Sequence, residues 1–182
     1  MLYDNQEVLK YLNEQQGKLV QLFGDADAGR TQTVFSILNH LTEQNKLCAY
    51  WVPLKEEFRE NVFQEAVRNK EYCIIGFPKT VSELRVFLKL ADGVDTICID
   101  NFLQYILHKQ KQEIRAIFSL LSAAAFEYKT NFILVNDLRY YKEKGGLHPA
   151  YQEYFYYFCR KHIQVQKDSD FHISYAFVQV NR

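Results

Sequence analysis

Short, mainly apolar runs alternate along the chain with stripes of apolar residues at helical spacing. A short apolar run is typical of a strand buried on both faces, and apolar positions that repeat every three or four residues are typical of an amphipathic helix. The alternation predicts a mainly parallel sheet with helices on both faces, a three-layer α/β fold. The expected strands lie at residues 18–23, 47–52, 72–75, 95–100 and 131–136, and the expected helices at residues 34–41, 58–67, 80–91 and 114–128.

Two further patterns sharpen this expectation. Thr80 followed by Glu83 has the spacing of a capping box, which predicts that a helix begins there. Residues 162–166 and 171–180 have the pattern of two antiparallel strands, and the polar residues 167–170 between them are suited to a turn. We therefore expect the parallel sheet to end in an antiparallel C-terminal extension.

Length and composition indicate one folded domain over residues 1–182. At about 150 residues per domain, a chain of 182 residues is most simply one domain. The apolar fraction of 48% and the charged fraction of 24% are ordinary for a globular protein, and 7 Gly with 3 Pro leave no room for a flexible linker. Four isolated cysteines in apolar surroundings predict buried, reduced thiols, not a metal or disulfide framework: Cys48, Cys73, Cys98 and Cys159.

Charge and hydropathy limit the partners and the location. The 22 basic residues are balanced by 22 acidic ones, so any contact with nucleic acid must come from a local patch or be shared with another subunit. The polar, acidic N-terminus is unlike a secretory signal, and the longest uncharged apolar stretch, at residues 116–126, is too short to span a bilayer. We expect an intracellular protein without membrane contact.

The most informative stretch follows the first expected strand and precedes an amphipathic helix. Residues 24–31 have the spacing G-x-x-x-x-G-K-[ST] of a phosphate-binding loop, with Arg30 in place of the lysine. Such a loop directs backbone N–H groups and the positive end of the following helix at phosphate oxygens. The alternative is an ordinary glycine-bounded turn without a ligand. The predicted nucleotide-binding residues here are Gly24, Asp25, Ala26, Asp27, Ala28, Gly29, Arg30, Thr31 and Gln32.

A second candidate site residue ends the fourth expected strand. Asp100 follows an apolar run, as does the aspartate that holds Mg²⁺ through water in phosphate-loop proteins. Together with the Thr31 hydroxyl it forms the predicted metal site, with Mg²⁺ and ATP as the expected cofactors. This prediction requires the loop to lie at the carboxyl edge of the sheet with Asp100 facing it.

Taken together, these motifs resemble the RecA-type recombinase family, in particular its short eukaryotic and archaeal paralogues with degenerate Walker motifs. The resemblance extends from about residue 18 to about residue 167: the loop at 24–32, the segment 50–60 with Phe58-Arg59, the strand ending at Asp100, the strand ending in Asn136-Asp137, and Gly145-Gly146 followed by Arg160-Lys161. It implies a RecA-like phosphate-loop NTPase core. It also implies that Asp137 stands at the position of the family's γ-phosphate sensor, among the nucleotide-binding residues.

The sequence departs from the family at three positions of the phosphoryl-transfer site. The Walker lysine is Arg30, the sensor glutamine is Asp137, and the catalytic glutamate falls on Lys55, which cannot accept a proton while charged. Glu56 or Glu57 would replace the missing base only with a shift in the loop register. Since each loss removes transition-state stabilisation, we expect weak or no ATP hydrolysis.

A local basic segment is the candidate for contact with DNA. Residues 139–167 carry six basic and two acidic residues, a local charge of +4, and tyrosines lie between them. Basic side chains with aromatic faces for unstacked bases are typical of single-strand binding surfaces. The alternative is a solvated turn followed by a strand or helix buried at the sheet edge. The predicted DNA-binding residues are Arg139, Lys142, Lys144, Arg160 and Lys161.

The resemblance implies a subunit of a DNA-repair mediator complex for homologous recombination, nuclear if the organism is eukaryotic. It would join a recombinase or recombinase paralogue, and a small adaptor, in a hetero-oligomer and assist filament assembly on single-stranded DNA. The alternative is an active DNA-dependent ATPase of the RecA family. A third hypothesis is a phosphate-loop regulator outside recombination, related to kinases or clock proteins.

Overall fold

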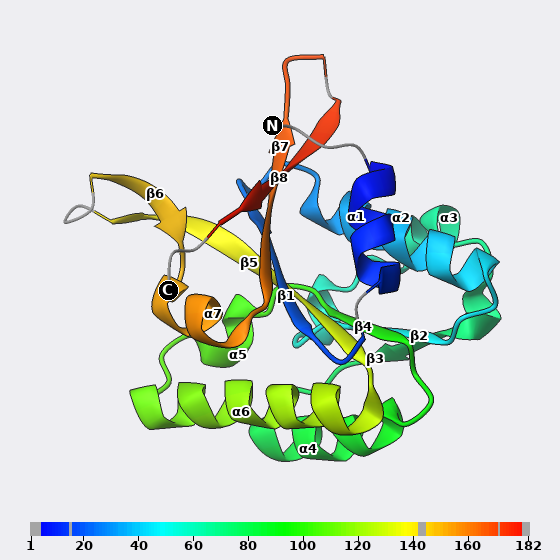
Figure 1. Ribbon diagram of the computed structural model, residues 1–182, viewed down its shortest axis with the longest axis horizontal. Coiled ribbons are helices and arrows are strands. Elements are labelled where there is room, and N and C mark those ends of the chain that lie inside the picture. Colours follow the sequence, from blue (N-terminus) through cyan, green and yellow to red (C-terminus); the bar gives the residue numbers. More distant parts are fainter. Residues whose placement is uncertain (1–4, 15, 142–144, 171, 180–182) are drawn as a thin grey trace.

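A sheet of eight strands forms the framework of the computed structural model, which describes residues 5–14, 16–141, 145–170 and 172–179 (Figure 1). The strands are β1 (Leu19–Gly24), β2 (Cys48–Trp51), β3 (Cys73–Gly76), β4 (Thr96–Ile99), β5 (Asn131–Tyr141), β6 (Gly146–Pro149), β7 (Lys161–Lys167) and β8 (Ile173–Val178). Their order is β3-β2-β4-β5-β1-β7-β8, with β6 paired to β5. The β5–β6 and β7–β8 pairs are antiparallel and the others are parallel, so the predicted sheet and its antiparallel extension are confirmed.

Seven α-helices connect these strands in the described residues. They are α1 (Asn5–Glu14), α2 (Arg30–Glu43), α3 (Glu60–Ala66), α4 (Val81–Leu88), α5 (Leu103–Ile106), α6 (Lys111–Tyr128) and α7 (Gln152–Phe158). Three short 3₁₀ turns are η1 (Lys55–Glu57), η2 (Lys70–Tyr72) and η3 (Lys89–Ala91). Within the described ranges, none of the helices is both long and apolar enough to cross a bilayer.

Strand alternation creates a hydrophobic core on each face of the sheet. Along β5, Phe132 and Leu134 belong to one core, which contains residues of α4, α5, α6 and α7, while Ile133 and Val135 belong to the other, which contains residues of α1, α2 and α3. Successive side chains of a strand point to opposite faces of the sheet, so a fully apolar strand contributes side chains to both cores. Figure 1 shows the two groups of helices on either side of the sheet.

The short elements α5 and β6 were not among the expected helices and strands, and three further elements differ from the sequence-based expectation. Residues 5–14 form α1, whose Val8, Leu9 and Leu12 are buried at helical spacing within a segment that is polar overall. β5 continues to Tyr141 because its last four residues pair with β6. The aromatic segment 154–158, for which strand and helix were both open, lies in the helix α7.

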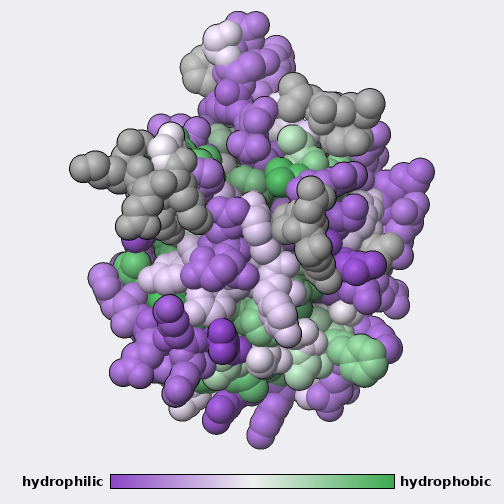
Figure 2. All heavy atoms as spheres, turned by 60° about the vertical axis from the view of Figure 1, so that its left-hand side comes forward, coloured by the Kyte–Doolittle hydropathy of each residue, from purple (hydrophilic) through white to green (hydrophobic). Residues whose placement is uncertain are grey.

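The predicted turn at residues 167–170 is confirmed at the hydrophilic tip of the β7–β8 hairpin, the projection at the top of Figure 2. The Asp168 carboxylate accepts hydrogen bonds from the backbone N–H groups of Asp170 and His172, both at 2.9 Å. These bonds lower the pKa of Asp168, with the His172 bond the larger cause. The turn is therefore closed by its own side chain.

The four cysteines are free thiols, as predicted. Cys48, Cys98 and Cys159 are buried and Cys73 is partly buried. Burial raises the pKa of Cys48 to about 12 and that of Cys73 to about 12, so both thiols stay protonated at neutral pH.

The capping box at the start of α4 is present and provides a test of local stability. Glu83 N–H donates to Thr80 Oγ1 at 3.1 Å, and the Glu83 carboxylate accepts from the N–H groups of Lys79 at 2.7 Å and Thr80 at 3.0 Å. Thr80→Ala removes the acceptor for an N–H group in the first turn of α4. We expect it to lower the free energy of unfolding by about 1 kcal/mol, measured by urea denaturation. Ser82→Ala, at an exposed position of the same helix, is the control, and equal effects of the two changes would contradict this account.

Candidate nucleotide site

The connection between β1 and α2 lies at the carboxyl edge of the parallel sheet, as the phosphate-loop prediction requires. The two glycines of this connection, which have no side chains, allow it to lie close to the C-terminal strands. A Cβ at Gly24 would lie 2.6 Å from the Val165 carbonyl oxygen, and Gly29 has a φ of 84°, with an added Cβ 2.5 Å from Ile173 Cδ1. A side chain at Gly24 would therefore push the loop away from β7, and one at Gly29 would be strained by the positive φ and would displace the Ile173 side chain.

The loop itself is a short turn with an open outer surface. Ala28 N–H donates to the Asp25 carbonyl oxygen at 3.1 Å, and Ala28 is buried. Asp25, Ala26 and Asp27 are exposed, as is Gln32 in the first turn of α2. Gly29 precedes α2 directly, so the free N–H groups at the start of this helix face the same edge of the sheet.

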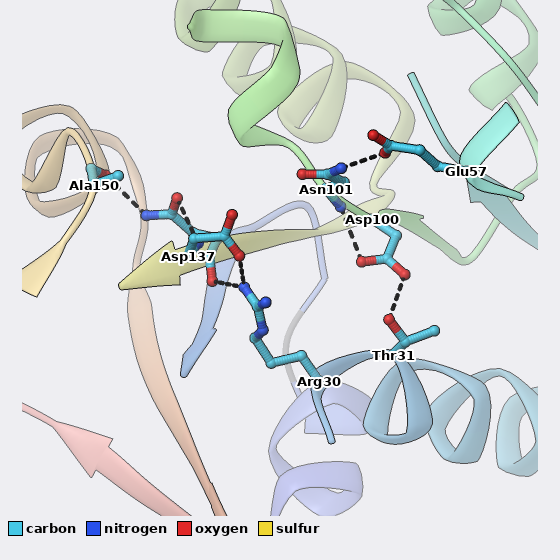
Figure 3. A network of polar contacts seen from close by, with 8 residues as sticks. Arg30, Thr31, Glu57, Asp100, Asn101, Asp137 and Ala150 are labelled. Carbon is cyan, nitrogen blue, oxygen red and sulfur yellow. Dashed lines mark hydrogen bonds and ion pairs between the residues drawn. The ribbon is translucent and has the colours of Figure 1, made fainter. Parts of the chain in front are cut away.

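Arg30, the first residue of α2, is bound to the end of β5. Its Nη1 donates to the Asn136 carbonyl oxygen at 2.7 Å and forms an ion pair with Asp137 Oδ1. The Arg30 side chain is 14% exposed and that of Asp137 is 36% exposed. Figure 3 shows the guanidinium reaching from the helix to the strand. The structure thus joins two of the predicted nucleotide-binding residues to each other.

Thr31, the second residue of α2, is bound to the other predicted carboxylate. Its hydroxyl donates to Asp100 Oδ2 at 2.9 Å. The same oxygen accepts from the Tyr50 hydroxyl at 2.7 Å, and Oδ1 accepts from Asn101 N–H at 2.9 Å. Asp100 is 8% exposed, so its carboxylate is nearly withdrawn from water and bonded at both oxygens. The expectation that Asp100 faces the loop is confirmed.

The parity of the strands explains why both carboxylates face α2. Cys98 on β4 belongs to the core that contains α2 residues, and Asp100 is two residues further on. Val135 on β5 belongs to the same core, and Asp137 is two residues further on. Since side chains two apart on an extended chain share a face, both carboxylates point toward the first turn of α2.

Tyr50 is a contact that the sequence reasoning missed. It lies on β2, in register with Cys98, and its ring packs against Phe35 with centroids 5.2 Å apart and against Phe63 at 5.8 Å. Burial, followed by the negative charge of Asp100, raises the pKa of Tyr50, so it remains a hydrogen-bond donor. In the sequence, the only signal for this contact was the position of Tyr50 in an expected strand, where alternate side chains share a face.

The two candidate general bases occupy different surroundings. Glu57 Oε2 accepts a hydrogen bond from Asn101 Nδ2, which joins Glu57 to the residue after Asp100 (Figure 3). Glu56 instead pairs with Lys79, at an N–O distance of 3.8 Å. Lys55, at the position of the family's catalytic glutamate, has its Nζ 5.9 Å from the centroid of the Phe77 ring. The structure thus connects Glu57, and not Glu56, to the network around Asp100.

The oxygen atoms of Thr31 and Asp100 are of the kind that Mg²⁺ prefers. Within the residues that the structure describes, no group of three or more His, Cys, Asp or Glu side chains is arranged to hold a metal ion. A Mg²⁺ ion at this site would therefore take its further ligands from water and from phosphate oxygens of a bound nucleotide, which is the usual arrangement for this ion.

The three predicted DNA-binding residues that the structure describes do not form one patch. Arg139 is exposed on the part of β5 that extends past the carboxyl edge, and Lys142 and Lys144 lie outside the described residues. Lys161 is in register with Val20, which pairs with Ile133, six residues before Arg139 on β5. At about 3.3 Å per residue, Lys161 therefore lies about 20 Å from Arg139 along the strands. Arg160 precedes Lys161 and is exposed. The Lys161 Nζ lies over two aromatic rings, 5.3 Å from the centroid of Tyr11 and 5.6 Å from that of Phe177.

A scan against protein-family models and a search of the curated proteins both find no match to this chain.

Tyr50→Phe tests the hydrogen bond between Tyr50 and Asp100. The ring packing against Phe35 and Phe63 is retained while Asp100 Oδ2 loses one of its two donors. Because a hydrogen bond to a charged group contributes about 1.5–3 kcal/mol, we expect the free energy of unfolding to fall by that amount in urea denaturation.

Tyr128→Phe, at a partly buried tyrosine on α6, is the matched control for loss of a phenolic hydroxyl. If both variants lost the same stability, the Tyr50–Asp100 bond would not be the source of the effect.

Proposed function

We propose that this chain is a RecA-like recombinase paralogue with a degenerate phosphate-loop NTPase core. It binds a nucleotide with Mg²⁺ weakly, hydrolyses it slowly or not at all, and acts as one subunit of a mediator complex. In that complex it assists the assembly of a recombinase filament on single-stranded DNA. The observation that carries this proposal is the pairing of Thr31 with Asp100 beside the Gly24–Gly29 loop, while Arg30 is bound to Asp137.

The loop geometry supports the nucleotide part of the proposal. A glycine-bounded turn precedes a helix of 14 residues at the carboxyl edge of a parallel sheet. In the first turn of this helix, the Thr31 hydroxyl oxygen lies 2.9 Å from Asp100 Oδ2 at the same edge. Ligands of open α/β sheets bind at this edge, and helix N-termini favour anions.

The surroundings of three residues support slow turnover. Nη1 of Arg30 donates to a backbone carbonyl and a carboxylate, so this nitrogen meets a phosphate only after one of these contacts breaks. Lys55 lies over Phe77 and offers no carboxylate to activate water. Asp137 is an anion where the resemblance implies a neutral glutamine. Each of these features removes stabilisation from a phosphoryl-transfer transition state.

The charge distribution supports action within a complex. The chain has no net charge, and Arg139 lies about 20 Å along the strands from Lys161. A single strand that contacts the hairpin of β5 and β6 would therefore need basic surface from a partner, since phosphate neutralisation supplies most of the affinity. A recombinase, a second paralogue or a small adaptor would supply it.

The test is a filament-assembly experiment with the recombinase of the same organism. Addition of this protein should increase the rate of assembly on fluorescently labelled single-stranded DNA, while the protein alone, with ATP, Mg²⁺ and DNA, should release phosphate no faster than background. Assembly that is unchanged by the protein, with no retention of the recombinase in a pull-down, would contradict the mediator function. A partner unrelated to repair, together with no DNA contact, would favour a regulator outside recombination.

A second candidate function, an active DNA-dependent ATPase, is favoured by the contact between Glu57 and Asn101. This contact brings one carboxylate next to the Asp100 network, where a general base would be needed. If it is correct, Glu57→Gln lowers DNA-stimulated phosphate release by about 100-fold or more, because general-base catalysis contributes about 10²–10⁴-fold.

Glu56→Gln is the matched control, since Glu56 pairs with Lys79 and has the same change in charge. The ATPase alternative further expects turnover to be lost in Asp100→Ala and Arg30→Ala. Absence of DNA-stimulated turnover in the unaltered protein rejects this alternative.

A further inference from the structure

Carboxylates outnumber cations in the polar network beside the loop that Figure 3 draws. Among the residues drawn in Figure 3, Asp100, Asp137 and Glu57 are acidic and Arg30 alone is a cation. Asp25 and Asp27 are exposed within the loop. A phosphate chain placed over the first turn of α2 would therefore approach several negative groups with one guanidinium to offset them.

One nitrogen of that guanidinium, Nη1, already contacts an anion of the protein itself. Arg30 contacts both the carboxylate of Asp137 and the carbonyl of Asn136, and its side chain is 14% exposed. The Asp137 carboxylate thus takes the place at Arg30 that a phosphate oxygen of a ligand would otherwise take.

Hydrogen bonds other than those of Arg30 also hold the strand around Asp137. The Asn136 side chain accepts from Asp137 N–H at 2.9 Å and donates to the Ala150 carbonyl at 2.9 Å. Ala150 N–H in turn donates to the Asp137 carbonyl at 2.9 Å. Because these bonds tie β5 to the chain between β6 and α7, Asp137 does not depend on the ion pair alone for its position.

We infer that Asp137 sets the charge of the ligand, so that this site takes a nucleoside diphosphate in preference to a nucleoside triphosphate. The inference rests on the proposed nucleotide-binding function. A diphosphate can be held by the loop N–H groups and the start of α2 while Arg30 stays paired with Asp137. A triphosphate brings one more anionic group, which must either displace Asp137 from Arg30, leaving that carboxylate unpaired, or approach the Asp137 carboxylate while it holds Arg30.

The experiment measures the equilibrium binding of fluorescent ADP and of a fluorescent, non-hydrolysable ATP analogue to the full chain with Mg²⁺. We expect the unaltered protein to bind the diphosphate about tenfold more tightly or better, which lies between the effect of one unfavourable charge contact in bulk water and that of one near a protein surface. In Asp137→Asn the added negative group no longer meets a carboxylate, so the ratio should fall to about one or invert.

Asp92→Asn is the matched control. Asp92 is exposed and lies before β4, at the amino edge of the sheet and thus opposite the loop, and the substitution makes the same change in charge. It should keep the ratio of the unaltered protein. Asp137→Ser is a second neutral variant, to be used if Asp137→Asn fails to fold as judged by its thermal transition, and it should also lose the preference.

The outcomes separate this inference from the function on which it rests. If both nucleotides bind and the ratio is near one in the unaltered protein, or stays unchanged in the neutral variants, the role of Asp137 is wrong while nucleotide binding stands. If neither nucleotide binds to any of the folded proteins, both the proposed nucleotide site and the inference are overturned.

Discussion

The hydrogen bond between Thr31 and Asp100 is the contact on which the interpretation of this molecule depends. It joins the first turn of α2 to the end of β4, although the strand that leads into α2, β1, is not a neighbour of β4 in the sheet. The intervening strand, β5, carries the other carboxylate, Asp137. A parallel register brings all three strand ends to one edge, so residues far apart in the sequence meet over a single helix start.

The Asp100 carboxylate is held by three donors from three segments, namely Thr31, Tyr50 and the backbone of Asn101. A buried carboxylate needs such bonds, because an unpaired charge at this depth would be strongly destabilising. The same bonds fix its orientation, so a divalent cation would meet a preformed ligand. The hydrogen bonds that make the buried Asp100 carboxylate stable are therefore the ones that would orient it for the proposed binding of a cation.

Asp137 and Asn136 show how one strand end serves two faces. Asp137 points to α2 and binds Arg30, while Asn136 points to the opposite face and bonds to Ala150. The charged contact is on the side of the loop, and the neutral contact fixes the base of the β5–β6 hairpin. Because Arg30 also binds the Asn136 carbonyl, replacing Arg30 would remove a hydrogen bond to the backbone of β5.

Much of the fold followed from the sequence by local physical rules. Apolar runs identified the strands β1 to β5, Thr80 and Glu83 identified the start of α4, and glycine spacing identified the loop before α2. These features depend on neighbours within a few residues. The helix α1 was missed because its buried residues are few within a polar segment, and α7 was left open because a short aromatic run suits a strand or a helix equally well.

Only the tertiary structure decided which side chains meet at the site. The sequence placed Arg30, Thr31, Asp100 and Asp137 at the ends of elements, but it did not order the strands. The pair Arg30–Asp137 spans 107 positions and Tyr50–Asp100 spans 50, so neither pairing is encoded in a local pattern. The sequence by itself determined the elements and the loop. The order of the strands decided the partners of Arg30 and Asp100, because contacts between distant residues are set by packing and register.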